Sequence, residues 1–303
     1  MKKLHGITIA MVTPMDEGGA VNYSELARLT DFLIERGVDC LYPCGTTGEM
    51  FHLSVKEREQ IAETVVKRAA GRVTVYIHAG AMTLSDTIEL ARHAEAIHAD
   101  GVGVVTPAFF SATPAELENY YITVARSVSP EFPVYLYNIP QCAANDLSVA
   151  SARRIAEACP NIVGIKYSFA DMLRTQDYLS VKEDFSVLQG ADRLLVAVLA
   201  MGCDGTVTGA GCVYPEPFVA IMKAWREGDL KQARALQKSA NRLIETMRCG
   251  ANMAYFKEAL ALRGINGKHM RAPQLDLTKD ELDAYVKALR EAEQALPKGL
   301  LKA

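Results

Sequence analysis

A lysine inside an apolar run carries the clearest chemical signal in the chain. Lys166 follows the run 162–165, whose composition is typical of a buried strand. In the period-two alternation of a strand, Lys166 shares a face with Gly164, where there is room, while Val163 and Ile165 would face the helices. Lysine is rarely buried unless it is paired or functional. Burial favours the neutral amine, which can attack a carbonyl carbon to form a Schiff base. The alternative is a strand-end lysine that reaches solvent.

Two further segments place hydroxyl groups at the ends of apolar runs. In the segment 45–49, Gly45 precedes Thr46 and Thr47, and a second glycine follows them. Two hydroxyls and the backbone N–H groups between glycines form a cradle suited to a carboxylate, although an ordinary turn has the same composition. Tyr137 opens the second segment, Tyr-Asn-Ile-Pro. Its phenol is a candidate for the same site, and the alternative is a packing residue whose hydroxyl has a hydrogen-bond partner.

The composition limits what these groups can serve. The chain has 303 residues, of which 50% are hydrophobic and 23% charged, so a disordered or fibrous chain is excluded. Lys and Arg total 33 against 36 Asp and Glu, with no basic run, and the richest apolar stretch, 194–203, is too short to span a bilayer. Neither nucleic acid nor membrane is an expected partner. Seven scattered cysteines without a C-x-x-C pair favour a cytoplasmic protein, and six histidines without zinc-ligand spacing predict no metal.

The elements that must position these groups alternate between strands and helices at a spacing of about 30 residues. Capping pairs such as Ser54 with Glu57 mark helix starts, and Gly101 is among the glycines expected to end helices. The predicted strands are 7–14, 40–45, 73–80, 101–107, 133–138, 162–168, 185–190 and 205–208.

This alternation predicts an α/β fold with parallel strands, either as an open doubly wound sheet or as a closed barrel. Eight units within about 225 residues match the (β/α)8 TIM barrel in number and length. The first predicted strand is not followed by G-x-G-x-x-G, the dinucleotide-binding pattern of the open sheet. We therefore expect the TIM barrel.

After residue 228 the strand pattern stops. Helical patterns cover 229–248, 253–263 and 278–295. We expect a catalytic barrel over residues 1–228 and a C-terminal helical extension, 229–303, that packs on the barrel or on a neighbouring subunit. In TIM barrels the active site lies at the C-terminal ends of the strands.

Three segments in this order and spacing carry a family resemblance: 45–49, Tyr137 to Pro140, and Gly164 to Lys166. They resemble the dihydrodipicolinate synthase / N-acetylneuraminate lyase family of pyruvate-dependent class I aldolases. The resemblance implies a covalent imine between Lys166 and pyruvate or its adduct, proton relay by Tyr137, and a carboxylate held at Thr46, Thr47 and Gly45. It also implies a homotetramer that needs no metal or separate cofactor.

Two positions depart from the synthase pattern. Cys142 stands where synthases carry an arginine for the carboxylate of the aldehyde partner. Phe109 stands where a tyrosine hydroxyl completes the family's proton relay. These departures disfavour a synthase, although Arg193 is a candidate for a cation that has moved. The alternative for Arg193 is a surface residue at a helix start.

Other positions are similar to the sugar-acid lyases of the family. The resemblance places Ser168, Gly190, Asp192 and Val207 beside the substrate. The leading hypothesis is a lyase that cleaves or forms a C–C bond between pyruvate and an aldehyde, with a 3-deoxy-2-oxo sugar acid as the larger partner. A 4-hydroxy-tetrahydrodipicolinate (dihydrodipicolinate) synthase, a 2-oxo acid dehydratase on the same scaffold, and a 2-oxo-acid-binding protein without turnover remain as alternatives.

Overall fold

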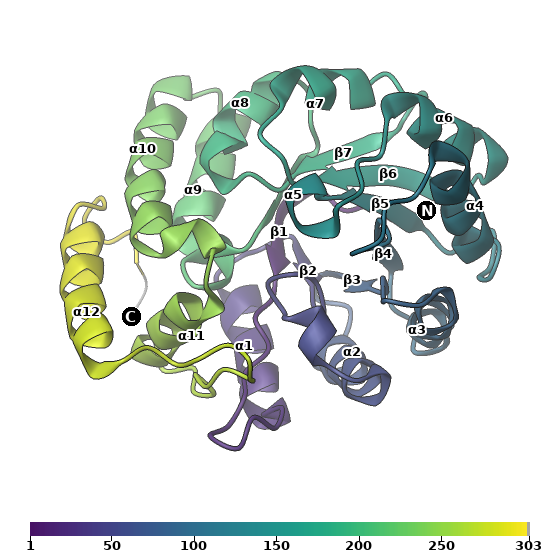
Figure 1. Ribbon diagram of the computed structural model, residues 1–303. Helices are drawn as coiled ribbons and strands as arrows, with labels where there is room; N and C mark the ends of the chain where they lie inside the picture. The colour runs from purple at the N-terminus through teal and green to yellow at the C-terminus, as the bar shows by residue number, and fades with distance from the viewer. Residues whose placement is uncertain (302–303) are drawn as a thin grey trace.

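Eight parallel strands close into a barrel in the order in which they occur in the chain (Figure 1). The computed structural model describes residues 1–301. The strands are β1 (Gly6–Ala10), β2 (Cys40–Tyr42), β3 (Thr74–His78), β4 (Gly101–Val105), β5 (Val134–Asn138), β6 (Ile162–Tyr167), β7 (Ser186–Gln189) and β8 (Gly205–Thr208). The predicted TIM barrel is confirmed. Most strands end earlier than predicted, because the last residues of the apolar runs leave the sheet and enter the loops at its C-terminal end.

Helices surround the barrel and connect its strands. The longer ones are α1 (Tyr23–Glu35), α2 (Val55–Ala69), α3 (Leu84–Ala96), α4 (Pro114–Ala125), α6 (Val149–Ala158), α7 (Met172–Tyr178), α8 (Leu195–Ala200) and α9 (Pro215–Arg226). Short turns are α5 (Pro140–Ala143), η1 (Met50–His52), η2 (Asp192–Leu194), η3 (Ala210–Cys212) and η4 (Arg248–Gly250). Ser54 and Glu57 form the expected capping box at the start of α2, with both hydrogen bonds present.

Tyrosines lie in the barrel interior, and the glycines of β4 leave room for two of them. A Cβ at Gly103 would overlap the hydroxyl of Tyr42. Gly101 has the same role for the ring of Tyr76, so its assignment as a helix end is wrong: Gly101 begins β4, and His98, with φ of 60°, takes the left-handed conformation after α3. The glycines of β4 therefore reflect packing inside the barrel.

One irregularity changes the faces of β6. Tyr135 pairs with Gly164 and Val134 with Ile162, so the ladder skips one residue between them. As a result Val163 packs in the interior cluster with the tyrosines, and the expectation that it faces the helices is wrong. Ile165 packs in the outer core as predicted.

Three helices complete the chain and lie to one side of the barrel (left and lower centre in Figure 1). They are α10 (Leu230–Thr246), α11 (Met253–Leu262) and α12 (Lys279–Gln294). Helix α10 packs on α9 and α12 packs on α10, while α11 approaches the mouth of the barrel. None of the helices in residues 1–301 is long and apolar enough to cross a membrane.

Candidate active site

Lys166 lies inside the barrel. It is 4% exposed, and β5 pairs with β6 so that Tyr137 lies beside it. The Nζ atom is 4.0 Å from the centroid of the Tyr137 ring and 5.0 Å from that of Tyr42. Lys166 therefore does not extend to solvent, and its amine lies against two aromatic rings.

A hydroxyl pair leads from the lysine toward solvent. The Oη atom of Tyr137, a residue that is 1% exposed, lies 3.1 Å from Oγ1 of Thr46. Thr46 itself is exposed. Because either hydroxyl can donate to the other, this pair can transfer a proton between the interior and the barrel mouth. Three predicted site residues, from β6, β5 and the loop after β2, are thus in one place.

The loop 45–50 holds its two threonines in a tight turn. The backbone N–H of Glu49 donates to the carbonyl of Thr46 (3.0 Å), and that of Met50 donates to the carbonyl of Gly45 (3.3 Å). A Cβ at Gly48 would lie 3.0 Å from the carbonyl oxygen of Met11, so only glycine fits there without displacement.

A carboxyl group follows β7, the strand that pairs with the strand of Lys166. The Oδ2 atom of Asp192 accepts a hydrogen bond from the backbone N–H of Ala210 (2.9 Å), whereas Oδ1 is buried without a hydrogen-bond partner. Burial raises the pKa of Asp192 to about 6, although the nearby charge of Lys166 acts in the opposite direction. Oδ1 therefore keeps a free acceptor position.

Ser168 and Gly190 pack against each other at the ends of β6 and β7. A Cβ at Gly190 would overlap Oγ of Ser168, so glycine at 190 lets the serine occupy its position. Gly45 lies over the ring of Tyr42, and Val207 is a buried member of the interior cluster. Ser168 and Gly190 thus follow β6 and its neighbour β7, whereas Gly45 follows β2 and Val207 lies on β8.

Three other predicted residues are not in contact with Lys166. Arg193 forms an ion pair with Glu245 of α10 (3.0 Å), and its side chain is 53% exposed. Phe109 is 76% exposed, has φ of 74°, and packs edge to face on Phe110. Cys142 is exposed on α5.

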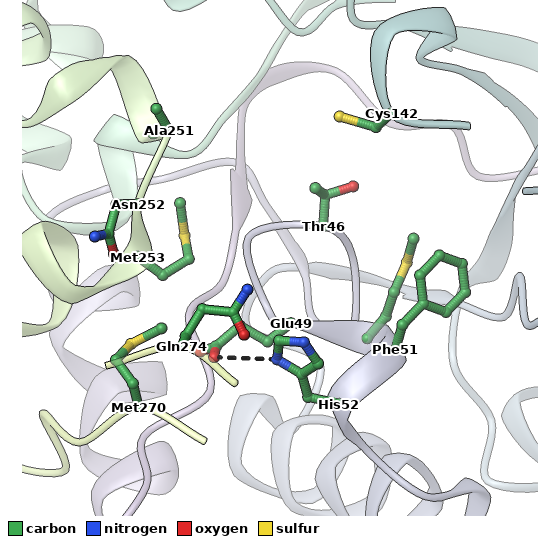
Figure 2. Close-up of a pocket in the computed structure, with 12 residues that line it drawn as sticks. Thr46, Glu49, Phe51, His52, Cys142, Ala251, Asn252, Met253, Met270 and Gln274 are labelled. Carbon is green, nitrogen blue, oxygen red and sulfur yellow. Dashed lines mark ion pairs between the residues drawn. The ribbon is translucent and has the colours of Figure 1, made fainter. Parts of the chain in front are cut away.

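A cleft of about 500 Å³ opens over Thr46, between the loop after β2 and the C-terminal helices (Figure 2). Cys142 forms one wall, and Asn252 and Met253 lie on the other side of Thr46. Most of the lining side chains are apolar. The full set is Thr46, Glu49, Met50, Phe51, His52, Cys142, Gly250, Ala251, Asn252, Met253, Met270 and Gln274.

Sequence reasoning missed His78, which lies in the barrel beside Tyr42 and Tyr137. Its Nδ1 atom is 3.0 Å from the carbonyl oxygen of Cys44 and 3.4 Å from Nη2 of Arg58, while Nε2 is buried without a partner. Burial, together with the charges of Arg58 and Lys166, holds the pKa of His78 well below its usual value. His78 is therefore neutral. His78 ends an apolar run just as Lys166 does, and this position in the sequence is the signal that could have identified it.

Within residues 1–301, no group of three or more His, Cys, Asp or Glu side chains is arranged to hold a metal ion.

The chain is similar to known proteins over almost its whole length. Residues 3–292 match the model of the Dihydrodipicolinate synthetase family. A 4-hydroxy-tetrahydrodipicolinate synthase of Aquifex aeolicus is 32% identical, with 94% of this chain and 97% of the relative covered. A probable 2-dehydro-3-deoxy-D-pentonate aldolase of Escherichia coli is 37% identical, with 78% and 80% covered. The structure of an E. coli prophage protein of the dihydrodipicolinic acid synthase family, in complex with pyruvate, has a TM-score of 0.90 and 30% identity, with 95% and 98% covered.

Proposed function

We propose a reaction for this chain from one premise: it belongs to the Dihydrodipicolinate synthetase family, whose members are metal-independent, pyruvate-dependent class I lyases. The reaction is cleavage or formation of a C–C bond through an imine on Lys166, with a 3-deoxy-2-oxo sugar acid as the larger substrate. One observation carries the proposal. Buried Lys166 lies against Tyr137, and the phenol of Tyr137 is hydrogen-bonded to Thr46.

The proposed reaction begins when the neutral amine of Lys166 attacks C2 of the 2-oxo acid. Protonation of the carbinolamine hydroxyl and loss of water leave a protonated imine. Removal of the proton from the 4-hydroxyl group then breaks the C3–C4 bond. The aldehyde departs, and the bonding electron pair enters the iminium to give an enamine. Protonation at C3 and hydrolysis release pyruvate and regenerate the amine; condensation is the reverse sequence.

Tyr137 and Thr46 are the groups that would move protons in these steps. Their hydroxyls are 3.1 Å apart, and exposed Thr46 connects the buried phenol with solvent. Thr46 and Thr47 would also hold the carboxylate of the 2-oxo acid, because the hydrogen bonds of the turn 45–50 fix these two residues and a hydroxyl group can donate to a carboxylate oxygen. Such donors hold the reacting carbonyl at a fixed distance from Lys166.

A hydroxylated partner agrees better with the mouth of the barrel than a dicarboxylate does. Cys142 lines the cleft where synthases have an arginine, and partial desolvation raises the pKa of its thiol, so the thiol is neutral. A distal carboxylate in that place would lack a cation. Asp192, by contrast, offers an unpartnered oxygen to a hydroxyl group, and Ser168 is the second proposed contact.

A substrate comparison tests this choice. We expect a 3-deoxy-2-oxo sugar acid to release pyruvate, whereas aspartate semialdehyde with pyruvate should give little or no cyclised product. Pyruvate release from a panel of 2-oxo sugar acids and product formation from the semialdehyde are the measurements. Efficient condensation with the semialdehyde would restore the synthase, and loss of water without pyruvate release would indicate a dehydratase. Imine formation without any turnover would indicate a binding protein.

Arg193→Ala is the matched variant for the same comparison. In the parent chain the guanidinium of Arg193 is paired with Glu245 and half exposed. We therefore expect kcat/KM for the sugar acid to change by less than about threefold in the variant. A lost charge-assisted contact with substrate would instead cost about 1.5–3 kcal/mol, or roughly ten- to a hundredfold. A defect of that size would point to a dicarboxylate such as 4-hydroxy-2-oxoglutarate.

Asp192 predicts a pH dependence for the sugar acid. Since burial raises the pKa of this carboxyl to about 6, the acceptor is ionised above pH 6 and becomes protonated as the pH falls through that value. We expect kcat/KM of the parent chain to fall below pH 6. The ratio of its kcat/KM to that of Asp192→Asn should therefore decrease there. Parallel pH profiles of the two proteins between pH 5 and 8 would exclude Asp192 from hydrogen bonding to the substrate.

The proposal includes a cytoplasmic homotetramer, as the family resemblance implies. Phe109 and Phe110 support this part, because their rings are 76% and 75% exposed in the single chain. Adjacent exposed aromatic side chains are typical of interfaces between subunits.

A further inference from the structure

Glu49 and Lys257 form the most deeply buried ion pair among residues 1–301. The Oε1 and Nζ atoms are 2.6 Å apart, and the side chains are 4% and 1% exposed. The Nζ atom of Lys257 also donates to the carbonyl oxygen of His269 (2.8 Å). Glu49 belongs to the loop that carries Thr46 and Thr47, whereas Lys257 lies on α11 in the C-terminal part of the chain. The pair therefore joins the loop at the barrel mouth to a helix outside the barrel.

The backbone of Glu49 needs such an attachment. Its φ of 60° lies in the left-handed region, which is disfavoured for a residue with a Cβ. This conformation closes the turn, because the N–H of Glu49 donates to the carbonyl of Thr46. A strained residue persists only where its surroundings hold it, and here the side chain is held by Lys257.

Helix α11 approaches the same loop at a second point. A Cβ at Gly209 would lie 3.1 Å from Oγ1 of Thr47 and 3.2 Å from Cε2 of Phe256. Thr47 and Phe256 thus lie on either side of a space that only glycine can occupy without displacing one of them. Phe256 and Lys257 are consecutive residues of α11. Phe256 lies near Thr47, close to Gly209, and Lys257 pairs with Glu49.

We propose that Lys257 and Glu49 are positioning residues that hold Thr46 and Thr47 in the geometry that binds the carboxylate of the 2-oxo acid. This inference rests on the proposed function, in which these threonines hold that carboxylate. Loss of either charge leaves the other one buried without its close partner, which should release the loop; the other neighbour of Glu49 is His52, whose Nδ1 is 3.8 Å from Oε2. Affinity for pyruvate then falls, while the chemistry at Lys166 remains available at high pyruvate concentration. A KM effect is therefore expected without an equal kcat effect.

The test measures borohydride trapping of pyruvate as a function of pyruvate concentration. For Lys257→Met and Glu49→Gln we expect the half-saturating concentration to rise by about 10- to 100-fold, the cost that misplacement of a binding group by about an ångström carries. The labelled fraction at saturation should stay close to that of the parent chain. Lys257→Arg should retain most of the affinity for pyruvate, because it keeps the charge on α11.

Two controls separate positioning from stability. Arg263→Met breaks another buried ion pair, with Glu216, outside the loop 45–50; it should lower Tm and leave the half-saturating concentration within about twofold. The double variant Glu49→Gln with Lys257→Met removes both charges, so Tm should recover relative to Lys257→Met while the affinity for pyruvate stays low. If Lys257→Met does not fold, Glu49→Gln and the double variant decide the matter.

An unchanged half-saturating concentration in folded Glu49→Gln or double-variant protein would overturn the inference and leave the pair as a structural contact. Full recovery of affinity in the double variant, in step with Tm, would overturn it as well. Failure of the proposed function gives a different result: the parent chain itself would show no trapping, or Lys166→Ala would be labelled as strongly as the parent.

Discussion

Lys166→Ala should abolish borohydride trapping of pyruvate while the barrel stays folded. Only a primary amine within reach of a bound 2-oxo group can form the imine, and Lys166 presents its amine between the rings of Tyr137 and Tyr42 inside the barrel. Lys166→Arg should also abolish labelling, because a guanidinium keeps the charge but stays protonated and does not form the imine. Mass spectrometry of the reduced protein measures the adduct, and circular dichroism measures the fold.

Lys182→Ala is the matched control for this experiment. Burial lowers the pKa of Lys182, and its Nζ donates to the carbonyl oxygen of Ile162, at the start of the strand that carries Lys166. If partial desolvation alone made a lysine reactive toward pyruvate, Lys182 would carry the label too. We expect Lys182→Ala to be labelled like the parent chain. Undiminished labelling of folded Lys166→Ala would assign the nucleophile to another lysine.

The barrel can be predicted from the sequence because each strand–helix unit carries its own local signals. The capping box of Ser54 and Glu57 forms as expected, and Thr278 and Glu281 form another at the start of α12. These signals depend on residues a few positions apart, so no tertiary information is needed to find them. The closing order of the strands then follows from the preference for short, right-handed connections.

The errors in the fold arise where distant residues decide the local structure. Val163 turns inward because the pairing of β5 with β6 skips a residue, and nothing in the run 162–165 indicates that irregularity. Gly101 is glycine because the ring of Tyr76, from the preceding strand, occupies the space of a Cβ. Such requirements are set by neighbours across the sheet.

The same distinction applies to the candidate site. Lys166 is conspicuous because a charged residue interrupts an apolar run. Lys257 carries no such signal, since a lysine in a helix is usually exposed, and its partner Glu49 lies in a distant part of the chain. His78 gives a weaker form of the signal of Lys166, because histidine is buried more often than lysine.

Tyr137→Phe should lower turnover by about 10²- to 10⁴-fold, the usual contribution of a positioned general acid–base group. The buried phenol of Tyr137 lies beside Lys166 and is hydrogen-bonded to exposed Thr46, so its removal interrupts the connection between the reacting atoms and solvent. Imine formation, as measured by trapping at saturating pyruvate, should fall less than kcat does. Pyruvate release under steady-state conditions measures the effect on turnover.

Phe109→Tyr and Tyr135→Phe are the matched variants for this prediction. The ring of Phe109 is 76% exposed and packs on Phe110, so a hydroxyl added there should change turnover modestly. Tyr135 is also buried in β5, but its hydroxyl accepts a hydrogen bond from the backbone N–H of Leu4, so its loss should affect stability more than kcat. If Tyr137→Phe behaved like either variant, the main proton path would not pass through Tyr137. Neutral His78, whose Nε2 has no partner, would then be the next residue to replace, because it lies edge to face against the Tyr137 ring.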